Sequence, residues 1–458
     1  RTSRLTPVPE GAYKTKPHLL AVDAIVRPRA QGERLDKTTY LVIGGGMSGL
    51  SFADWISSED YLVMETLNEL GGYCRTVKQD GFVWDFSGHF FHFRRPEIER
   101  YLVERMGDQE IRTVAKNSRI YFEGNMVDFP FQKNIHQLPK EDFIDCLHDL
   151  YFKDEVYPPE RAGENFEAML YSKFGRGIAE RFLVPYNEKL YATDLKTLDV
   201  DAMGRFFPYA DVPEIIRNFR RADNASYNAS FTYPAGGAVQ YVHAMAAGVK
   251  PERVCLEEPV LSIDLEQKVA TTPRRQIQFE HVISSAPFPK LLKMTGVEHS
   301  PETYSYNKVL VFNLGFDRKG PAEDHWVYFP SPDQVFYRIG FYDNILGAER
   351  MSLYVEIGYA ADAEIDADHV QAMLERTLAD LEACGIVDGH NLVSYHSIVL
   401  DPAYVHITKD SIADVEAKKA VLAAHGVHSI GRYGSWTYCS IEDNIVEARA
   451  LAEELVPR

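Results

Sequence analysis

Short apolar runs and turn residues alternate near residue 40 of the chain. Residues 40–43 and 61–65 are mostly apolar, and a helix is expected over 48–57 between them. A short apolar run that ends in glycine is typical of a buried parallel strand. The order strand, helix, strand therefore predicts the βαβ start of a doubly wound α/β fold.

The pattern changes twice farther along the chain. Residues 139–222 are expected to be mainly helical, because apolar residues recur at helical spacing, and short strand-like runs separated by Gly, Pro and Asp turns over about 304–360 predict an antiparallel sheet. The last helix is expected to open on a capping box at Ser440. The predicted helices cover 141–150, 178–190, 366–384, 411–425 and 440–455, and the predicted strands cover 308–316, 326–330, 335–342, 352–359 and 427–430.

Composition and charge narrow the class of protein. The chain has 458 residues, enough for two or three domains, and its formal net charge of −18 argues against a nucleic-acid binder. Its five cysteines form no C-x-x-C pair, which favours a cytoplasmic protein without a metal site or a disulfide framework. No apolar run is long enough to span a membrane. The polar, proline-containing residues 1–36 are interpreted as an N-terminal extension and a candidate contact of a homo-oligomer.

A glycine-rich turn follows the first predicted strand. The run GGGMSG over 44–49 matches G-x-G-x-x-G, in which glycines permit a tight turn, a close approach to a pyrophosphate and close helix packing. A carboxylate at the end of the second strand is placed to hold ribose hydroxyls. The alternative is a glycine turn without a nucleotide. The candidate cofactor residues of this motif are Gly44, Gly46, Met47, Ser48, Gly49 and Glu65.

Two further motifs indicate that the dinucleotide is FAD and not NAD. Gly71-Gly72 follows Glu65, with Arg75 and Thr76 close behind, and a glycine pair at this place recurs in FAD enzymes. Gly431-Arg432 lies between a predicted strand and the capped helix at Ser440, where backbone N–H groups are available to an anion or a ring edge. The alternatives are a plain turn for the first and a surface arginine for the second.

From about residue 38 onward the chain resembles the UDP-galactopyranose mutase family, particularly its eukaryotic branch, within the amine-oxidase and protoporphyrinogen-oxidase-like FAD superfamily. The resemblance implies a nucleotide-sugar mutase in which N5 of reduced FAD attacks the anomeric carbon, with NAD(P)H as a possible electron donor. Its segments are SGHFFH (87–92), FPFQKNI (129–135), PYNEKLY (185–191), GR (204–205), YPAGG (233–237), WVYFP (326–330), FYR (336–338) and GRYGSWTY (431–438).

The resemblance also implies roles for individual residues. Arg205 and Arg338 match the family's two phosphate-binding arginines, and a guanidinium fork suits a diphosphate. By strand alternation, Arg338 is expected on the same face as Phe336 and Tyr342. A third matching tyrosine position holds Ile345 instead, and Tyr191 stands where the family commonly has Trp.

The remaining implied residues surround the base, the sugar and the flavin. Aromatic rings and an amide suit a uracil ring, although aromatic core packing is the competing interpretation. His89, which follows Gly88, matches the family's flavin-side histidine, and a lone histidine is otherwise usually structural. The implied substrate-binding residues are Phe129, Phe131, Gln132, Tyr186, Asn187, Tyr191, Asn228, Trp326, Tyr328, Tyr404 and Tyr438.

These expectations combine into a Rossmann-type FAD-binding domain with an inserted helical domain and a mainly antiparallel substrate-binding sheet. The FAD-binding domain is expected over 38–98, 233–300 and 425–458, the mostly helical domain over 99–222 and the sheet domain over 301–424. Two other functions stay open: an FAD-dependent oxidoreductase of the amine-oxidase or protoporphyrinogen-oxidase type, and a flavoprotein that has lost catalysis and serves a partner.

Overall fold

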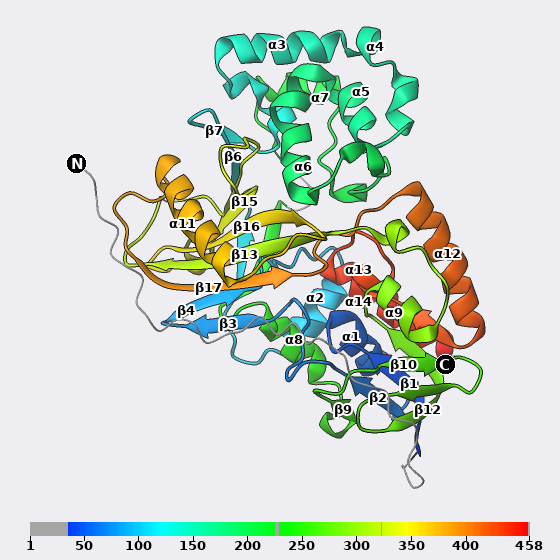
Figure 1. Ribbon diagram of the computed structural model, residues 1–458. Helices are drawn as coiled ribbons and strands as arrows, with labels where there is room; N and C mark the ends of the chain where they lie inside the picture. Colours follow the sequence, from blue (N-terminus) through cyan, green and yellow to red (C-terminus); the bar gives the residue numbers. More distant parts are fainter. Residues whose placement is uncertain (1–34, 225–228, 322, 457–458) are drawn as a thin grey trace. The chain divides into compact units, whose positions relative to one another are not determined.

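The first strands of the described chain lie in a seven-stranded sheet (Figure 1). β1 (Leu35–Ile43) pairs in parallel with β2 (Tyr61–Met64) and β12 (Gln276–Ser284). The strand order is β10, β11, β12, β1, β2, β9, and β18 pairs in parallel with β12. The computed structural model describes residues 35–224, 229–321 and 323–456. The other strands of this sheet are β9 (Val254–Cys255), β10 (Ser262–Asp264), β11 (Val269–Thr271) and β18 (Val427–Ser429).

Both faces of β1 are buried. Tyr40 and Val42 belong to an apolar cluster shared with the helices on one face, and Leu41 and Ile43 belong to a second cluster on the other face. This explains the unbroken apolar run in the sequence and confirms the predicted βαβ start. The helices of the first cluster are α1 (Met47–Trp55), α2 (Pro96–Val103), α8 (Val239–Ala246) and α14 (Ile441–Leu455), and α1 packs on α8 and α14.

A second seven-stranded sheet has the order β17, β13, β16, β15, β14, β6, β7. Its pairs are antiparallel except for β14 with β6, which is parallel. Of its strands, β6, β7 and β17 were not predicted individually, and the strand expected over 335–342 is shorter. The strands are β6 (Ser118–Phe122), β7 (Asn125–Asp128), β13 (Asn307–Phe316), β14 (Trp326–Tyr328), β15 (Arg338–Phe341), β16 (Ser352–Ala360) and β17 (Leu392–Leu400).

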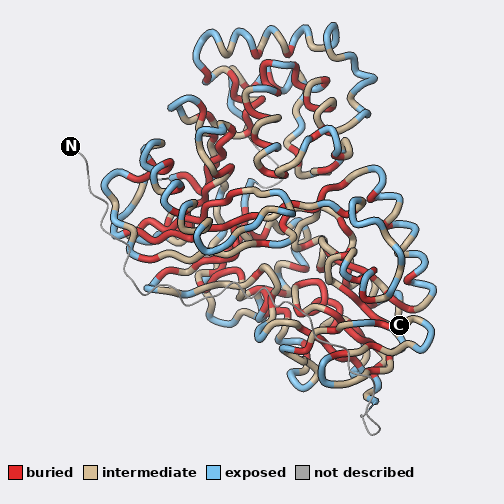
Figure 2. Tube along the Cα trace, in the orientation of Figure 1, coloured by how far each residue is buried: buried red, intermediate tan, exposed pale blue. Residues whose placement is uncertain are grey.

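The two faces of this sheet carry different clusters, and most of its strands are buried (Figure 2). Leu374 and Leu381 of α11 (Ala367–Ala383) cover one face together with Phe336, whereas Tyr342 belongs to the cluster on the other face. The expectation that Phe336, Arg338 and Tyr342 share one strand face is therefore wrong. The strand is confined to Arg338–Phe341, and Tyr342 begins the short helix α10 (Tyr342–Leu346).

The helices between residues 140 and 218 gather at the top of Figure 1. α3 packs on α5, and α5 continues through a π-helical turn, Ala179–Leu183, into α6. The range 99–222 is not purely helical, because β5 (Ile111–Ala115), β6 and β7 lie in it and the last two join the second sheet. The division into domains stays a prediction. The helices are α3 (Lys140–Tyr151), α4 (Lys153–Val156), α5 (Phe166–Ile178), α6 (Val184–Tyr191) and α7 (Val212–Asn218).

The end of the chain returns to the first sheet. After α12 (Lys409–Ala424) come β18, the short helix α13 (Gly431–Gly434) and α14. The predicted capping box at Ser440 is confirmed, with Asp443 as its partner. Across the described residues, no helix combines the length and the apolar character needed to cross a membrane. Two small sheets, β3 (Thr76–Gln79) with β4 (Phe82–Asp85) and β5 with β8 (Ser230–Pro234), and α9 (Phe288–Thr295) complete the elements.

Candidate active site

The turn between β1 and α1 leaves backbone N–H groups available to a ligand. Gly46 caps α1 without a side-chain hydrogen bond, so no cap side chain accepts from the first N–H groups of the helix. A β-carbon on Gly46 would lie 3.9 Å from Cα of Gly72, so the two glycine turns face each other. Gly49 packs against the carbonyl of Gly44, whose φ of 102° favours glycine. This arrangement fits the pyrophosphate of a dinucleotide.

Glu65 holds this turn together from the end of β2. Its Oε2 accepts a 2.7 Å hydrogen bond from the N–H of Gly45, and its Oε1 accepts a 2.8 Å bond from the N–H of Leu67. The N–H of Gly71 in turn donates to the carbonyl of Gly45 at 2.8 Å. The carboxylate is thus fixed beside the glycine turn, where a ribose hydroxyl could still donate to it.

The second glycine motif, Gly431-Arg432, lies beside the glycine turn that precedes α1. Gly431 has a φ of 83°, and a β-carbon there would lie 2.4 Å from Oγ of Ser48 in the first turn of α1. Two motifs almost 400 residues apart in the sequence therefore touch. Their contact supports a shared ligand, as the sequence predicts for FAD.

Arg75 and Thr76 are occupied with protein partners. Arg75 donates from Nε to the carbonyl of Gly72 at 2.8 Å and pairs with Glu69 at 2.9 Å. Thr76 donates to Asp85 at 2.6 Å, and burial raises the pKa of that carboxyl group to about 7. Arg75 thus supports the glycine pair, whereas Thr76 also accepts from the N–H of Val239 at 3.1 Å. Direct contact of either side chain with a cofactor stays a prediction.

One cavity collects most of the residues predicted for catalysis and substrate binding. It lies where the second sheet, the helical region and the start of α14 meet. Gly88 and His89 lie in its wall next to aromatic side chains from both sheet and helices. The predicted residues that line it are Gly88, His89, Phe129, Tyr186, Asn187, Arg205, Trp326, Tyr328, Arg338, Tyr404, Arg432 and Tyr438.

Three predicted residues lie behind the cavity wall. Phe131 is fully buried and stacks on Phe182 at 5.1 Å between ring centroids. Gln132 donates its amide to the carbonyl of Pro208, and Tyr191 packs edge-on against Tyr404 at 5.9 Å. Here the competing interpretation of core packing describes the observed contacts. Ile345 is also buried and does not line the cavity, and Asn228 lies outside the described residues.

Arg338 is held by a buried carboxylate. It donates from Nε and Nη2 to the two oxygens of Glu356, at 2.5 and 2.8 Å, and Glu356 is only 1% exposed. The two residues are direct partners across β15 and β16. The bidentate pair fixes the guanidinium and leaves Nη1 without a protein acceptor among the described residues.

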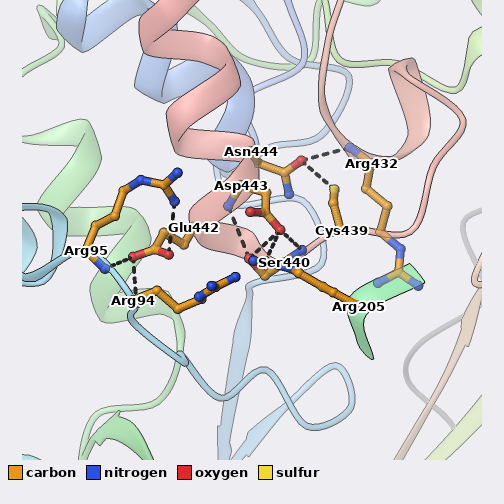
Figure 3. Close-up of polar contacts among 9 residues, drawn as sticks. All are labelled: Arg94, Arg95, Arg205, Arg432, Cys439, Ser440, Glu442, Asp443 and Asn444. Carbon is orange, nitrogen blue, oxygen red and sulfur yellow. Dashed lines mark hydrogen bonds and ion pairs between the residues drawn. The ribbon is translucent and has the colours of Figure 1, made fainter. Parts of the chain in front are cut away.

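Arg205 reaches the cavity from the other side, out of the 3-10 turn Gly204–Phe206. Its Nη2 donates to Asp443 at 2.5 Å and to Oγ of Ser440 at 3.4 Å, at the beginning of α14 (Figure 3). Asp443 is part of the helix capping box, so one carboxylate serves both the helix and the arginine.

Arg432 is the third guanidinium of the cavity. It lies over the rings of Tyr404 and Tyr438, at 5.1 and 4.5 Å, and its main-chain N–H donates to Asn444 at 2.9 Å (Figure 3). Its buried Nε has no hydrogen-bond acceptor within the described part of the chain. A buried donor without an acceptor is costly, which indicates that this place accommodates a polar ligand such as the cofactor.

His89 is a neutral side chain at ordinary pH. Burial lowers its pKa to about 4, and its Nδ1 lies 3.3 Å from the carbonyl of Ser87. A neutral imidazole can donate from one nitrogen and accept at the other. A role for His89 beside the flavin stays a prediction.

Lys189 ties the helical wall of the cavity to the sheet wall. Its ammonium lies 2.7–2.9 Å from the carbonyl oxygens of four residues in the loop between β14 and β15. Tyr186 and Asn187 precede it on α6, and Tyr328 and Arg338 flank the loop. The lysine therefore positions both walls. The four carbonyls belong to Phe329, Ser331, Gln334 and Phe336.

Sequence reasoning missed several cavity residues. Glu356 follows no motif, and only the register of β15 with β16 places it opposite Arg338. Glu442 is buried and accepts from the main-chain N–H groups of Arg94 and Arg95, which ties this loop to α14 (Figure 3). The missed lining residues include Tyr73, Ser87, Arg94, Tyr337, Tyr354, Glu356, Tyr433, Ser440 and Glu442.

Comparison with known proteins identifies the fold and the family. The model of the flavin containing amine oxidoreductase family matches residues 47–397, which is more than half of the chain. A reduced UDP-galactopyranose mutase is 24% identical, with a TM-score of 0.84 over 91% of this chain and 93% of that one. Cyclohexylamine oxidase from Brevibacterium oxydans is 15% identical, with a TM-score of 0.63 over 91% and 99% of the two chains. Putrescine oxidase bound to putrescine is 14% identical, with a TM-score of 0.63 over 93% and 100%. At these identities the likeness concerns the fold.

Proposed function

We propose that the chain, which belongs to the flavin containing amine oxidoreductase family, is a flavin-dependent nucleotide-sugar mutase. It would interconvert the pyranose and furanose forms of UDP-galactose or a close analogue. One observation carries this proposal. Three guanidinium groups, those of Arg205, Arg338 and Arg432, line a single cavity, and each retains N–H donors for which the described residues offer no acceptor.

Unused guanidinium donors favour an anionic ligand. Arg338 commits Nε and Nη2 to Glu356, and Arg205 commits Nη2 to Asp443 and Ser440. The remaining N–H groups suit the oxygens of a diphosphate, which accept bidentate hydrogen bonds from arginine. A protonated amine would instead meet the guanidinium of Arg432, which no carboxylate among the described residues neutralises, so the cavity supports a nucleotide sugar better than the amines of the oxidase relatives.

The residues of the cavity then divide into three tasks. The two glycine turns and Glu65 would hold FAD, which when reduced would supply the nucleophile for the anomeric carbon. Arg205 and Arg338 hold the diphosphate in the ground state and as it leaves. The aromatic walls around Tyr186 exclude water from the reacting sugar, because their rings cover the cavity on several sides. Phe129, Tyr186 and Asn187 are proposed for the base, and Trp326, Tyr328, Tyr404 and Tyr438 for the sugar and phosphates.

The proposal is tested with purified, FAD-loaded protein and UDP-galactofuranose. The assay is run with oxidised protein, with dithionite-reduced protein, and with NADH or NADPH in place of dithionite, and the products are separated by chromatography. We expect UDP-galactopyranose only when the flavin is reduced, since the oxidised ring has no nucleophilic N5. Turnover with a nicotinamide would identify the electron donor.

The control variant is Arg161→Ala, which removes a half-exposed arginine paired with Glu164 away from the cavity. It should leave turnover unchanged. Failure to convert any UDP-hexose, together with oxygen-dependent peroxide formation from an amine, would contradict the mutase and favour the oxidoreductase. Neither activity would favour a flavoprotein that serves a partner.

A further inference from the structure

Ser87 adopts a backbone conformation that serine rarely takes. Its φ is 77°, in the left-handed region, although it is neither glycine nor asparagine. It is buried, and it lies two residues before His89 in the cavity wall. Strain of this kind persists only where surrounding contacts hold it, and it concentrates at functional sites.

The contact that holds Ser87 is a buried carboxylate. Its hydroxyl donates to Oε1 of Glu356, the same oxygen that accepts from Nη2 of Arg338. Glu356 lies on β16, some 270 residues farther along the chain, and its other oxygen accepts from Nε of Arg338. One carboxylate therefore joins the strained serine to the guanidinium proposed to bind the diphosphate.

The backbone of Ser87 sets the position of His89. The carbonyl of Ser87 accepts a 3.3 Å hydrogen bond from the hydroxyl of Tyr342 and lies 3.3 Å from Nδ1 of His89. The backbone at Gly88, between them, leaves no room for a side chain, because a β-carbon there would lie 2.6 Å from the hydroxyl oxygen of Tyr354. A rotation of the backbone at Ser87 would therefore move the imidazole of His89.

We propose that Ser87 is a positioning residue whose hydrogen bond to Glu356 couples occupancy of Arg338 to the placement of His89 beside the flavin. The inference rests on the proposed function, because it takes the diphosphate at Arg338 and the flavin at His89. An anion at the remaining N–H groups of Arg338 shares the charge of the guanidinium with Glu356, and this changes the strength of the hydrogen bond that Glu356 accepts from Ser87. Such coupling is reciprocal, so a perturbed Ser87 weakens the response of the flavin to nucleotide.

The decisive variant is Ser87→Gly. Glycine accepts a φ of 77° without strain, so the protein should fold and bind FAD while the hydroxyl bond is lost. Ser87→Ala also loses the hydroxyl but keeps the strain. The matched control is Ser172→Ala, a buried serine on α5 whose hydroxyl donates to the carbonyl of Pro158 and which does not line the cavity.

Three quantities are measured on FAD-loaded protein: the flavin absorbance spectrum, its change on titration with UDP, and the UDP dissociation constant by calorimetry. In the wild type and in Ser172→Ala, UDP should change the flavin spectrum. In Ser87→Gly and Ser87→Ala, UDP should bind within about threefold of wild type, while the amplitude of the spectral change falls at least fivefold. With substrate, kcat should fall about tenfold and KM should stay nearly unchanged.

The two possible failures are distinguishable. If the wild type does not bind UDP, the proposed function fails, and the inference, which rests on it, fails with it. If UDP binds to the wild type and Ser87→Gly keeps the full spectral change and kcat, the inference fails and the proposed function stands. A parallel loss of UDP affinity and spectral change in Ser87→Gly would likewise overturn it, since Ser87 would then act on binding alone.

Discussion

Arg338 and Arg205 line the same cavity but are held in different ways. Arg338 pairs with Glu356 across neighbouring strands, and the carboxylate side chain is only 2% exposed. Arg205 pairs with Asp443 between a short turn and a helix, and both side chains are about one third exposed. A buried bidentate pair fixes a charge at the cost of desolvation. A partly exposed pair contributes little to the free energy of folding and breaks readily. The cavity thus combines one rigid cation with one that can turn toward a ligand.

The largest expected effect comes from removing the buried cation. Arg338→Met leaves Glu356 buried without its partner, and this should destabilise the protein by about 3–5 kcal/mol. The change is measured as a lower midpoint of thermal unfolding. The double variant Arg338→Met with Glu356→Gln should recover most of the stability but no turnover, because the phosphate contact stays absent. A single variant that unfolds at the wild-type temperature would show that Glu356 needs no cation.

Removing the exposed cation should act on binding and barely on folding. Arg205→Ala should change the free energy of unfolding by no more than about 1 kcal/mol, since both side chains of its ion pair are about one third exposed. Its UDP dissociation constant should rise about 10- to 100-fold, as expected for losing charged hydrogen bonds. Calorimetry measures this, with Arg161→Ala as the control. A large loss of stability without a loss of affinity would place Arg205 in the structure and not at the diphosphate.

The smallest expected effect separates two roles of Asp443. Asp443→Asn frees Arg205 from a competing carboxylate, so UDP should bind about two- to fivefold more tightly, most clearly at low salt. Thermal stability should fall slightly, because α14 loses an acidic group in its first turn. Calorimetry at two salt concentrations measures the affinity, with Glu164→Gln, which removes another exposed carboxylate paired with an arginine, as the control. Weaker binding in Asp443→Asn would show that Asp443 places Arg205 for the ligand instead of holding it away.

Local patterns were sufficient for the elements that carry the cofactor motif. The apolar run at 40–43, the glycine turn and the capping box at Ser440 each follow rules that act over a few residues, and β1, α1 and α14 confirm them. The α/β fold with a second, mainly antiparallel sheet followed from the same patterns together with the family resemblance. The likeness to known flavoproteins confirms that fold class.

The walls of the cavity depend on contacts that no local pattern contains. Phe129 lines the cavity and Phe131 does not, although both belong to one aromatic motif, because the 3-10 turn at Phe131–Lys133 directs the second ring inward to Phe182. Glu356 is found only when β15 and β16 are paired in register. Strand alternation misplaced Phe336 relative to Arg338, because the strand begins at Arg338, later than its apolar pattern suggests.

The contact between Gly431 and Ser48 has a consequence for the order in which the protein is made. A chain emerges from the ribosome from its N-terminus, so the turn at Gly44–Gly49 exists long before β12, β18 and α14 are synthesised. Until β12 pairs with it, β1 has one unpaired edge in the first sheet. The cofactor can therefore be enclosed only after these later elements have been synthesised. The glycine turn at 44–49 reaches its final surroundings only when Gly431 packs against Ser48.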